Sequence, residues 1–394
     1  MVPNRSDRLR VVASLVSTLL LASGLAQGAG LSAAQTREIS EVATRALTES
    51  ELPGLSVAVV KDGQIWAAGF GVADLEQSVP VSALTMFRIA SITKWLTATA
   101  AMRLVERGTL DLDAPVQKYC PRFPRKKWPV TSRQLLTHTA GVRHYHGQNG
   151  EKPETAAERK ALKDKIRREQ AGQYVRYTDV LGPLDAFKDD PLLFQPGTKA
   201  AYTSLGYRLL GCVLEGAARA PYRKLMRELV FEPAQMTITE DDVQAIIPHR
   251  AAGYSKGGDG KLIRAAFRDV SENLPAGGYL STAADLVRFA LAFESGKLVT
   301  DATRGQMLQH PRLTDGSLAP DPGGFSDFYY GFGIGVGPDS RPAWFHAGGQ
   351  SGMSGYLMWF PDTRIAVALL TNRDGDAIPW SMIGRIEAIA APQF

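Results

Sequence analysis

Ser91 and Lys94 are the two residues of this chain whose types and spacing best suit them to catalysis. A serine hydroxyl is a poor nucleophile at neutral pH, so it needs a base within hydrogen-bond distance. Residues three apart on a helix lie on one face, so a helix that starts at about Ser91 brings the Lys94 amine beside the Ser91 hydroxyl. An amine acts as a base only when it is neutral, which burial and nearby cations can achieve. The pair therefore predicts nucleophilic attack by Ser91 and transfer of an acyl group to its oxygen.

The residues after Ser91 favour this helix. An apolar stripe at helical period follows Lys94, and Gly108 supplies a stop signal. The stripe consists of Trp95, Leu96, Ala98, Ala101, Met102, Leu104 and Val105. A helix N-terminus directs free N–H groups and a partial positive charge at whatever binds there, which stabilises the oxyanion of a tetrahedral intermediate.

Two more motifs follow the serine and lysine in the order that penicillin-recognising enzymes show. They are Tyr202-Thr203-Ser204 and His346-Ala347-Gly348. With them, the chain resembles the serine beta-lactamase and D-Ala-D-Ala carboxypeptidase superfamily on its class C beta-lactamase branch. Over residues 52–372 it is most similar to the mitochondrial beta-lactamase-like serine proteases and their bacterial relatives. The other matching segments are Phe87-Arg88-Ile89-Ala90, Leu110-Asp111-Leu112-Asp113-Ala114-Pro115-Val116, Leu135-Leu136-Thr137-His138-Thr139-Ala140-Gly141-Val142, Pro196-Gly197 and Gly277-Gly278-Tyr279-Leu280-Ser281-Thr282.

The resemblance implies a role for each motif residue. Ser91 corresponds to the nucleophile, Lys94 to its activating base, and Tyr202 to the tyrosine that passes a proton to the leaving group. Four residues correspond to substrate-binding or oxyanion positions: Ser204, His346, Gly348 and Gly349. The expected oxyanion hole consists of the backbone N–H groups of Ser91 and Gly349.

One position departs from the family's pattern. The third residue of the tyrosine motif is often asparagine, whereas here it is Ser204. A hydroxyl cannot offer an amide to the acylamino carbonyl of a beta-lactam, so the departure predicts weak recognition of beta-lactam side chains.

Three other segments suggest competing roles. Gly253-Tyr254-Ser255-Lys256-Gly257 matches the nucleophile elbow of alpha/beta hydrolases, but the glycines after it predict a hairpin turn instead of a helix. His144-Tyr145-His146 supplies two potential metal ligands without a third, so we expect a surface loop and no metal site there. The resemblance implies that His138 is a structural histidine that orders a loop near the site.

Both ends of the chain carry hairpin patterns. Residues 55–60 and 64–70 flank Lys61-Asp62-Gly63, and residues 355–360 and 365–371 flank a second turn. Apolar faces at residues 36–49 and 380–390 predict helices that cover the resulting sheet. Together with the resemblance, these patterns predict an α/β (α+β) fold of the beta-lactamase/transpeptidase-like type. In it an antiparallel sheet, residues 36–87 and 245–394, is flanked by helices and interrupted by a helical part, residues 88–244.

The first 28 residues resemble a signal peptide. Three arginines precede a mostly apolar segment, residues 11–25, and Ala26-Gln27-Gly28 resembles a cleavage site. The segment is short for a membrane span of about 20 residues, with an uncleaved anchor as the alternative. We therefore expect an exported protein, periplasmic or secreted, with residues 29–394 as the hydrolase domain and no stable membrane insertion after cleavage.

Cys120 and Cys212 are expected to be two free thiols, with a disulfide as the alternative.

Charge and composition narrow the classes of partner. The net charge of +5 is small and dispersed, and no nucleic-acid motif, phosphate loop or zinc signature occurs, so we expect no nucleic-acid partner, no cofactor and no metal. Residues 151–177 are rich in both charges, which is typical of a solvated helix face, with a partner-binding insertion as the alternative. The oligomeric state stays open.

These observations predict an exported serine hydrolase that acts through an acyl-enzyme on a peptide, amide or ester. The alternatives are a true class C beta-lactamase or D-Ala-D-Ala carboxypeptidase, and a catalytically silent binding or scaffold protein of the same fold. The substrate is expected to be a small molecule or a peptide.

Overall fold

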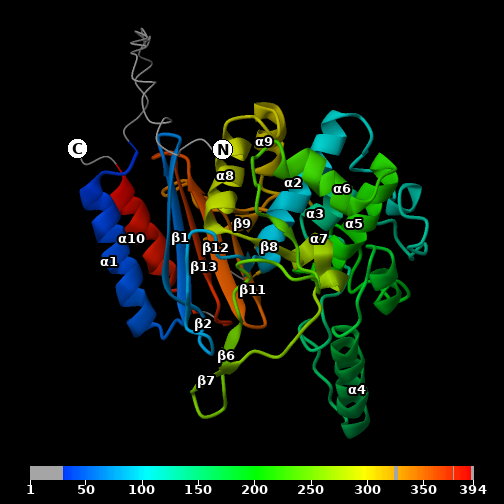
Figure 1. Ribbon diagram of the computed structural model, residues 1–394. Helices are drawn as coiled ribbons and strands as arrows, with labels where there is room; N and C mark the ends of the chain where they lie inside the picture. The colour runs from blue at the N-terminus through cyan, green and yellow to red at the C-terminus, as the bar shows by residue number, and fades with distance from the viewer. Residues whose placement is uncertain (1–29, 324–326, 376, 392–394) are drawn as a thin grey trace, which may run out of the picture.

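An antiparallel sheet of eight strands, in the order β3-β2-β1-β13-β12-β11-β10-β9, forms the centre of the fold (Figure 1). The computed structural model describes residues 30–323, 327–375 and 377–391, so the predicted signal peptide lies outside the described residues. The strands in chain order are β1 (Gly54–Lys61), β2 (Gln64–Asp74), β3 (Val79–Pro80), β9 (Tyr329–Tyr330), β10 (Gly335–Val336), β11 (Trp344–Gln350), β12 (Met353–Phe360) and β13 (Ile365–Thr371).

The two predicted hairpins are confirmed and lie next to each other in the sheet. β1 and β2 turn at Asp62 and Gly63, which have φ angles of 49° and 74°, and glycine adopts the left-handed conformation without steric cost. β1 pairs directly with β13, with Leu55 opposite Thr371, so segments from both ends of the chain form the middle of the sheet.

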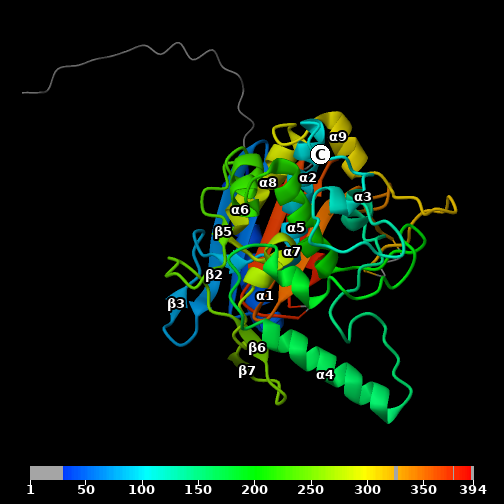
Figure 2. The same cartoon turned by 90° about the vertical axis from the view of Figure 1, so that its right-hand side faces the viewer.

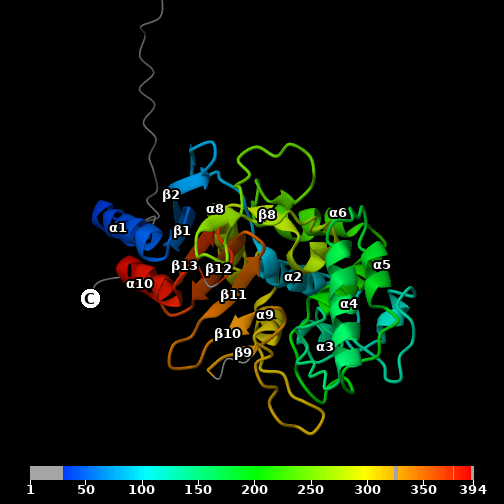
Figure 3. The same cartoon turned by 90° about the horizontal axis from the view of Figure 1, so that it is seen from below.

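Helices cover both faces of the sheet, as predicted. The side chains of Leu55, Val57 and Val59 pack toward α1 (Ala33–Glu49) and α10 (Trp380–Ala390), because alternate residues of a strand face the same side. The alternate β1 residues pack in the other core cluster, which includes α8 (Ala283–Glu294) and the inserted helices. Figure 3 shows the sheet between these two layers.

The inserted helices surround α2 (Thr93–Glu106), the predicted helix of the nucleophile. Its Trp95 is fully buried and makes edge-to-face contacts of 5.4 Å with both Phe289 and Phe293 of α8. The helix ends before Gly108, as the stop signal predicts. The other helices are α3 (Ser132–Leu136), α4 (Ala156–Gly172), α5 (Ser204–Ala218), α6 (Tyr222–Met226), α7 (Leu274–Gly277) and α9 (Asp301–Met307).

Shorter elements connect these layers. A small sheet joins β4 (Phe87–Arg88), β8 (Tyr279–Ser281) and β5 (Glu240–Asp241), and β6 (Tyr254–Lys256) pairs with β7 (Leu262–Arg264). The helical turns are η1 (Ala90–Ile92), η2 (Val116–Lys118), η3 (Gly182–Ala186), η4 (Arg227–Phe231) and η5 (Ser271–Asn273). Within the described residues, no helix combines the length and apolar character needed to cross a membrane.

The expectation of two free thiols is wrong. Cys120 and Cys212 form a disulfide, with their Cα atoms 5.6 Å apart. The reason is a close contact between the segment after η2 and α5: a Cβ on Gly216 would lie 1.8 Å from the Tyr119 carbonyl oxygen. Glycine at 216 lets the two backbones touch, and this contact brings the cysteines together.

We expect the Cys120→Ser/Cys212→Ser double variant to lose about 2–4 kcal/mol of unfolding free energy, because the cross-link closes a long loop in the unfolded chain. The two cysteines are 92 residues apart. Urea unfolding of the variant beside the wild type measures the difference. Equal urea midpoints for the two proteins would show that the disulfide does not form in solution.

Candidate active site

Ser91 lies in the short turn η1, immediately before α2. The preceding residue, Ala90, has a φ angle of 45°, a conformation that costs a non-glycine residue of the order of 1 kcal/mol. Ala90 is buried, and the Gly277 backbone packs against it. This packing holds the strained turn, which points the Ser91 side chain into a pocket at the start of the helix.

Lys94 is placed as a base for Ser91, as the spacing predicts. Its Nζ lies 2.9 Å from the Ser91 Oγ, 3.2 Å from the Ser204 Oγ and 3.0 Å from the Ala276 carbonyl oxygen. The side chain is fully buried, and no carboxylate of the described residues forms an ion pair with it. Burial, and to a lesser extent the positive charge of Arg208, lowers the pKa of Lys94 well below its ordinary value. A neutral amine is therefore available to accept the serine proton.

Tyr202 completes the group of residues around the nucleophile. Its hydroxyl forms a hydrogen bond with Ser91, and its ring lies 4.8 Å from the Lys94 Nζ. Burial raises the pKa of the phenol above its ordinary value, and the bond to Ser91 offsets part of that effect. The phenol is therefore neutral and able to donate a proton. The structure thus brings together the three residues predicted to be catalytic.

His138 orders the segment that carries Tyr202. Its Nδ1 accepts the Thr203 backbone N–H at 3.2 Å, and its ring packs 4.4 Å from the Tyr202 ring. Burial lowers the pKa of His138 well below its ordinary value, so the imidazole is neutral and able to accept that bond. This geometry agrees with the structural role that the family resemblance implies.

Ser204 and His144 form one wall of the pocket. The Ser204 hydroxyl accepts a hydrogen bond from Lys94, and its backbone N–H donates to the His144 Nδ1 at 3.2 Å. Residues 144–146 lie in a partly exposed loop, as expected, but His144 also lines the pocket, which the sequence did not predict. The fold turns this side chain inward because the Tyr202–Ser204 segment lies against it, a contact between residues 60 positions apart that sequence spacing does not reveal.

Gly348 and Gly349 lie on β11, which packs against η1. A Cβ on Gly348 would lie 2.3 Å from the Ile89 carbonyl oxygen, so only glycine permits this approach. Gly349 lines the same pocket as Ser91, with open space where a side chain would stand. The two residues that supply the expected oxyanion donors thus face one pocket, and Ser91 is at a helix start, where N–H groups lack partners within the helix.

His346 lies behind the pocket wall and is not among the residues that line the cavity. Its Nδ1 donates to the Ala347 carbonyl at 2.6 Å, so the Nε2 accepts from the Tyr330 hydroxyl at 2.9 Å. Burial lowers the pKa of His346 to about 3, which keeps the ring neutral. A substrate-binding role for His346 stays a prediction.

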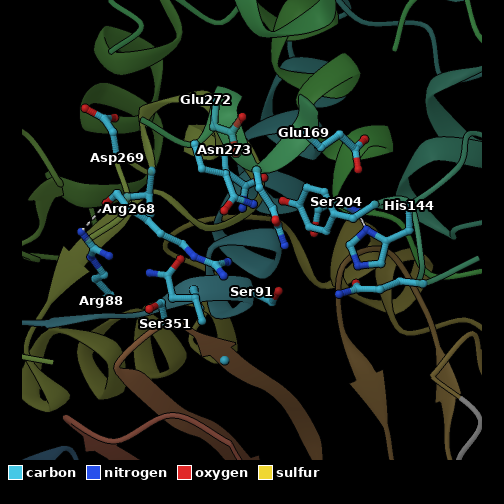
Figure 4. A pocket seen from close by; sticks show the side chains of 18 of the residues that line it. Arg88, Ser91, His144, Glu169, Ser204, Arg268, Asp269, Glu272, Asn273 and Ser351 are labelled. Atoms are coloured by element: carbon cyan, nitrogen blue, oxygen red, sulfur yellow. Dashed lines mark hydrogen bonds between the residues drawn. The ribbon is translucent and has the colours of Figure 1, made fainter. Parts of the chain in front are cut away.

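The pocket itself has a volume of about 380 Å³. Figure 4 shows Ser91 between Ser204 and His144 on one side and Arg268 on the other. The last turns of α4 contribute Ile166, Glu169 and Gln170, although no residue of this helix is buried. The charged segment is therefore a solvated helix that projects from the body and borders the pocket with its C-terminal end (Figures 1 and 2). A partner-binding role for α4 stays a prediction.

A polar network lines part of the pocket and extends behind it, and it includes residues outside the sequence motifs. Arg208 donates to Glu272 at 2.9 Å, to Asn273 at 3.2 Å and to the Tyr145 hydroxyl at 3.1 Å. Its side chain is almost fully buried, and its charge lowers the pKa of Lys94 and of His144. Arg208 thus helps to keep Lys94 neutral. The helical spacing of residues 204 and 208 was the only available pointer to it.

The competing nucleophile lies outside this site. Ser255 lies in the hairpin of β6 and β7, as predicted, and its Oγ donates to Asp374 at 2.5 Å; it is not among the residues that line the pocket. Among the residues described, no group of three or more His, Cys, Asp or Glu side chains could hold a metal ion.

Comparison with known proteins places this geometry in a family. Residues 39–386 match the family model for Beta-lactamase. The chain therefore belongs to the beta-lactamase family, whose members are serine hydrolases.

Particular relatives share parts of the chain. The mitochondrial serine beta-lactamase-like protein LACTB of Homo sapiens is 33% identical over 293 residues, which cover 62% of this chain and 54% of that protein. This chain thus spans about half the length of that relative. A beta-lactamase of Psychrobacter immobilis is 27% identical over 300 residues, covering 76% of this chain and 67% of that protein.

A solved structure shows the same fold. The structure of EstCE1, a hydrolase with promiscuous acyltransferase activity, covers 90% of this chain and 98% of its own, with a TM-score of 0.72 and 22% identity. The likeness confirms the predicted beta-lactamase/transpeptidase-like fold.

Proposed function

We propose that this chain is an exported serine hydrolase that acts through an acyl-enzyme on a peptide, amide or ester. The observation that carries the proposal is the buried, uncompensated amine of Lys94, 2.9 Å from the Ser91 hydroxyl. A lysine that only stabilised the fold would not need to lie against a serine that follows a strained residue and lines a pocket. Perturbed titratable groups of this kind are typical of catalytic sites.

The reaction follows from the positions of these groups. The Ser91 Oγ attacks the substrate's carbonyl carbon while the Lys94 Nζ takes the hydroxyl proton. The backbone N–H groups of Ser91 and Gly349 would stabilise the oxyanion. The proton then passes through Tyr202, which is bonded to Ser91, to the leaving amine or alkoxide as the carbonyl–leaving-group bond breaks. Water hydrolyses the resulting Ser91 ester and restores the free serine.

Two observations support export. Residues 1–28 have the pattern of a signal peptide. The Cys120–Cys212 disulfide is of a kind that persists in oxidising compartments such as the periplasm or the extracellular medium.

The substrate class follows from the wall of the pocket beside Ser91. The Ser204 hydroxyl accepts a bond from Lys94, and no side-chain amide stands at that position to bind a beta-lactam's acylamino group. Esters and amides need only the nucleophile, the base and the oxyanion donors. A true beta-lactamase is the second candidate, because the Psychrobacter immobilis relative carries that name.

We expect slow hydrolysis of nitrocefin, with kcat/KM below the ~10⁴ M⁻¹s⁻¹ at which enzymes usually begin to act on their own substrates. The reason is that acylation by the beta-lactam lacks the amide contact at position 204. A panel of nitrocefin, p-nitrophenyl esters, D-Ala-D-Ala peptides and chromogenic peptides, assayed on residues 29–394, measures the preference. Efficient nitrocefin turnover together with inactivity on esters and peptides would make the protein a beta-lactamase.

Covalent labelling distinguishes a hydrolase from a catalytically silent binding or scaffold protein of the same fold. A fluorophosphonate reacts with an activated serine whatever the natural substrate is. Stoichiometric labelling of the wild type supports a hydrolase, whereas an unlabelled, folded protein supports a binding or scaffold role.

A further inference from the structure

Arg268 is a pocket residue that the catalytic steps do not use. It follows the β6–β7 hairpin and lines the same cavity as Ser91. In Figure 4 its side chain extends into the pocket toward Ser91, from the side opposite His144. Its backbone carbonyl accepts a hydrogen bond from Arg88 at 2.9 Å, which holds the segment in place without engaging the guanidinium.

The other charged side chains of the pocket already have partners. Glu169 accepts from Arg143, Glu272 from Arg208, and Asp269 lies 3.7 Å from Arg176. The fourth, Arg88, donates to the carboxylate of Asp242 at 2.5 Å.

The guanidinium of Arg268, in contrast, forms no ion pair or side-chain hydrogen bond with any residue that the structure describes. Each of the three carboxylates lies in an ion pair with an arginine outside the cavity lining, and Glu169 shares its partner Arg143 with Asp190. Among the described lining residues, Arg268 is therefore the arginine without an ion-pair partner.

A second unused donor lies at the same end of the pocket. The Gln350 side-chain nitrogen is buried and has no hydrogen-bond partner among the described residues. The next residue, Ser351, donates to the Ala266 carbonyl at 3.0 Å, so the end of β11 and the 266–268 segment lie together. A guanidinium and an amide N–H at one end of a cavity match the oxygens of a carboxylate.

The electrostatic surroundings favour an anion as well. α4 borders the pocket and carries six Lys or Arg residues and three Asp or Glu residues; its one charged residue in the pocket lining is Glu169, which pairs with Arg143. An excess of positive charge beside a cleft raises the local concentration of anionic ligands.

We propose that the substrate of this site carries a carboxylate, or an anion of similar shape, that binds Arg268 while its ester or amide carbonyl lies at Ser91. The inference rests on the proposed hydrolase function. It assigns Arg268 as a specificity-determining residue for that reaction, with no part in the bond-making steps. The anion belongs either to the acyl group or to the leaving group, and the test below distinguishes the two.

Two matched substrate pairs test the proposal. The first pair varies the acyl group: the p-nitrophenyl monoester of glutaric acid against p-nitrophenyl pentanoate. The second pair varies the leaving group: the pentanoyl ester of 3-hydroxybenzoic acid against phenyl pentanoate. The readout is the ratio of kcat/KM for the anionic member to kcat/KM for the neutral member.

We expect Arg268→Gln to lower this ratio roughly 10- to 100-fold in one of the two pairs, because a charge-assisted hydrogen bond is lost. A change in rate that is common to both members of a pair cancels from the ratio, and Arg268→Lys should recover part of the ratio. The control is Lys261→Gln, which also removes one positive charge. Its side chain is 83% exposed and lies outside the pocket lining, so the ratio should not change.

Two results would overturn the proposal while leaving the hydrolase function in place. One is an unchanged ratio in both pairs for Arg268→Gln, and the other is an equal fall for Lys261→Gln. Failure of the wild type to hydrolyse any of the four esters, with no covalent labelling of Ser91, would instead remove the proposed function and this inference together.

Discussion

Replacement of Ser91 by alanine should lower hydrolysis of every substrate of this site by roughly 10⁴- to 10⁶-fold and abolish covalent labelling. The Ser91 oxygen is the atom that carries the acyl group, and within the described residues the Lys94 amine is hydrogen-bonded to the hydroxyls of Ser91 and Ser204. Ser204 is the alternative acceptor to exclude: because we expect it not to carry the acyl group, the residual rate of Ser91→Ala/Ser204→Ala should equal that of Ser91→Ala. Initial rates on a p-nitrophenyl ester measure both variants.

The matched control for this prediction is Ser255→Ala. Ser255 is the other serine whose sequence context resembles a nucleophile, and it lies in the β6–β7 hairpin. Its replacement should leave the rate within about 2-fold of the wild type. Thermal unfolding of Ser91→Ala should match that of the wild type, because a small side chain is tolerated in the η1 turn. Near-normal activity in Ser91→Ala, together with loss of activity in Ser255→Ala, would show that the site is misassigned.

Lys94→Met and Tyr202→Phe should each slow acylation by roughly 10²- to 10⁴-fold. Methionine fills the buried space of the lysine stem without its amine, and phenylalanine keeps the ring packed on His138 while removing the hydroxyl. The double variant should lose far less than the product of the two single losses, because both residues act on one proton path and such units are non-additive.

Pre-steady-state kinetics on an activated ester measures acylation directly in the four proteins of this cycle. The wild type, the two single variants and the double variant should unfold at similar temperatures, so that the rates report chemistry and not stability. Losses that multiply in the double variant would show that Lys94 and Tyr202 do not share a proton path.

The catalytic pair and the sheet could be predicted because their signals are local. Ser91 and Lys94 lie one helical turn apart, so periodicity alone places them side by side. The hairpins of β1–β2 and β12–β13 combine apolar strand residues with turn residues within short windows, and β1 and β13 are buried along almost their whole length. The pairing of β1 with β13, which joins the two ends of the chain, was not predicted, because no local pattern specifies it.

The remainder of the site depends on contacts between distant segments. Arg208 reaches Glu272 across 64 residues, and the Cys120–Cys212 bond spans 92. Residue types alone do not show that an arginine is buried or that two backbone segments touch at a glycine. The place of His144 in the pocket wall could not be predicted for the same reason, since only the fold brings Ser204 against its ring.

The measurement that tests the central claim most directly is the identity and rate of formation of the acylated residue. The wild type and Lys94→Met are each mixed with a p-nitrophenyl ester, quenched with acid at successive times, digested and analysed by tandem mass spectrometry. The account predicts one acyl group per chain, carried on the peptide that contains Ser91 and formed far more slowly without the lysine. An acyl group on Ser255 or another residue, or acylation of Ser91 at the same rate in both proteins, would contradict it.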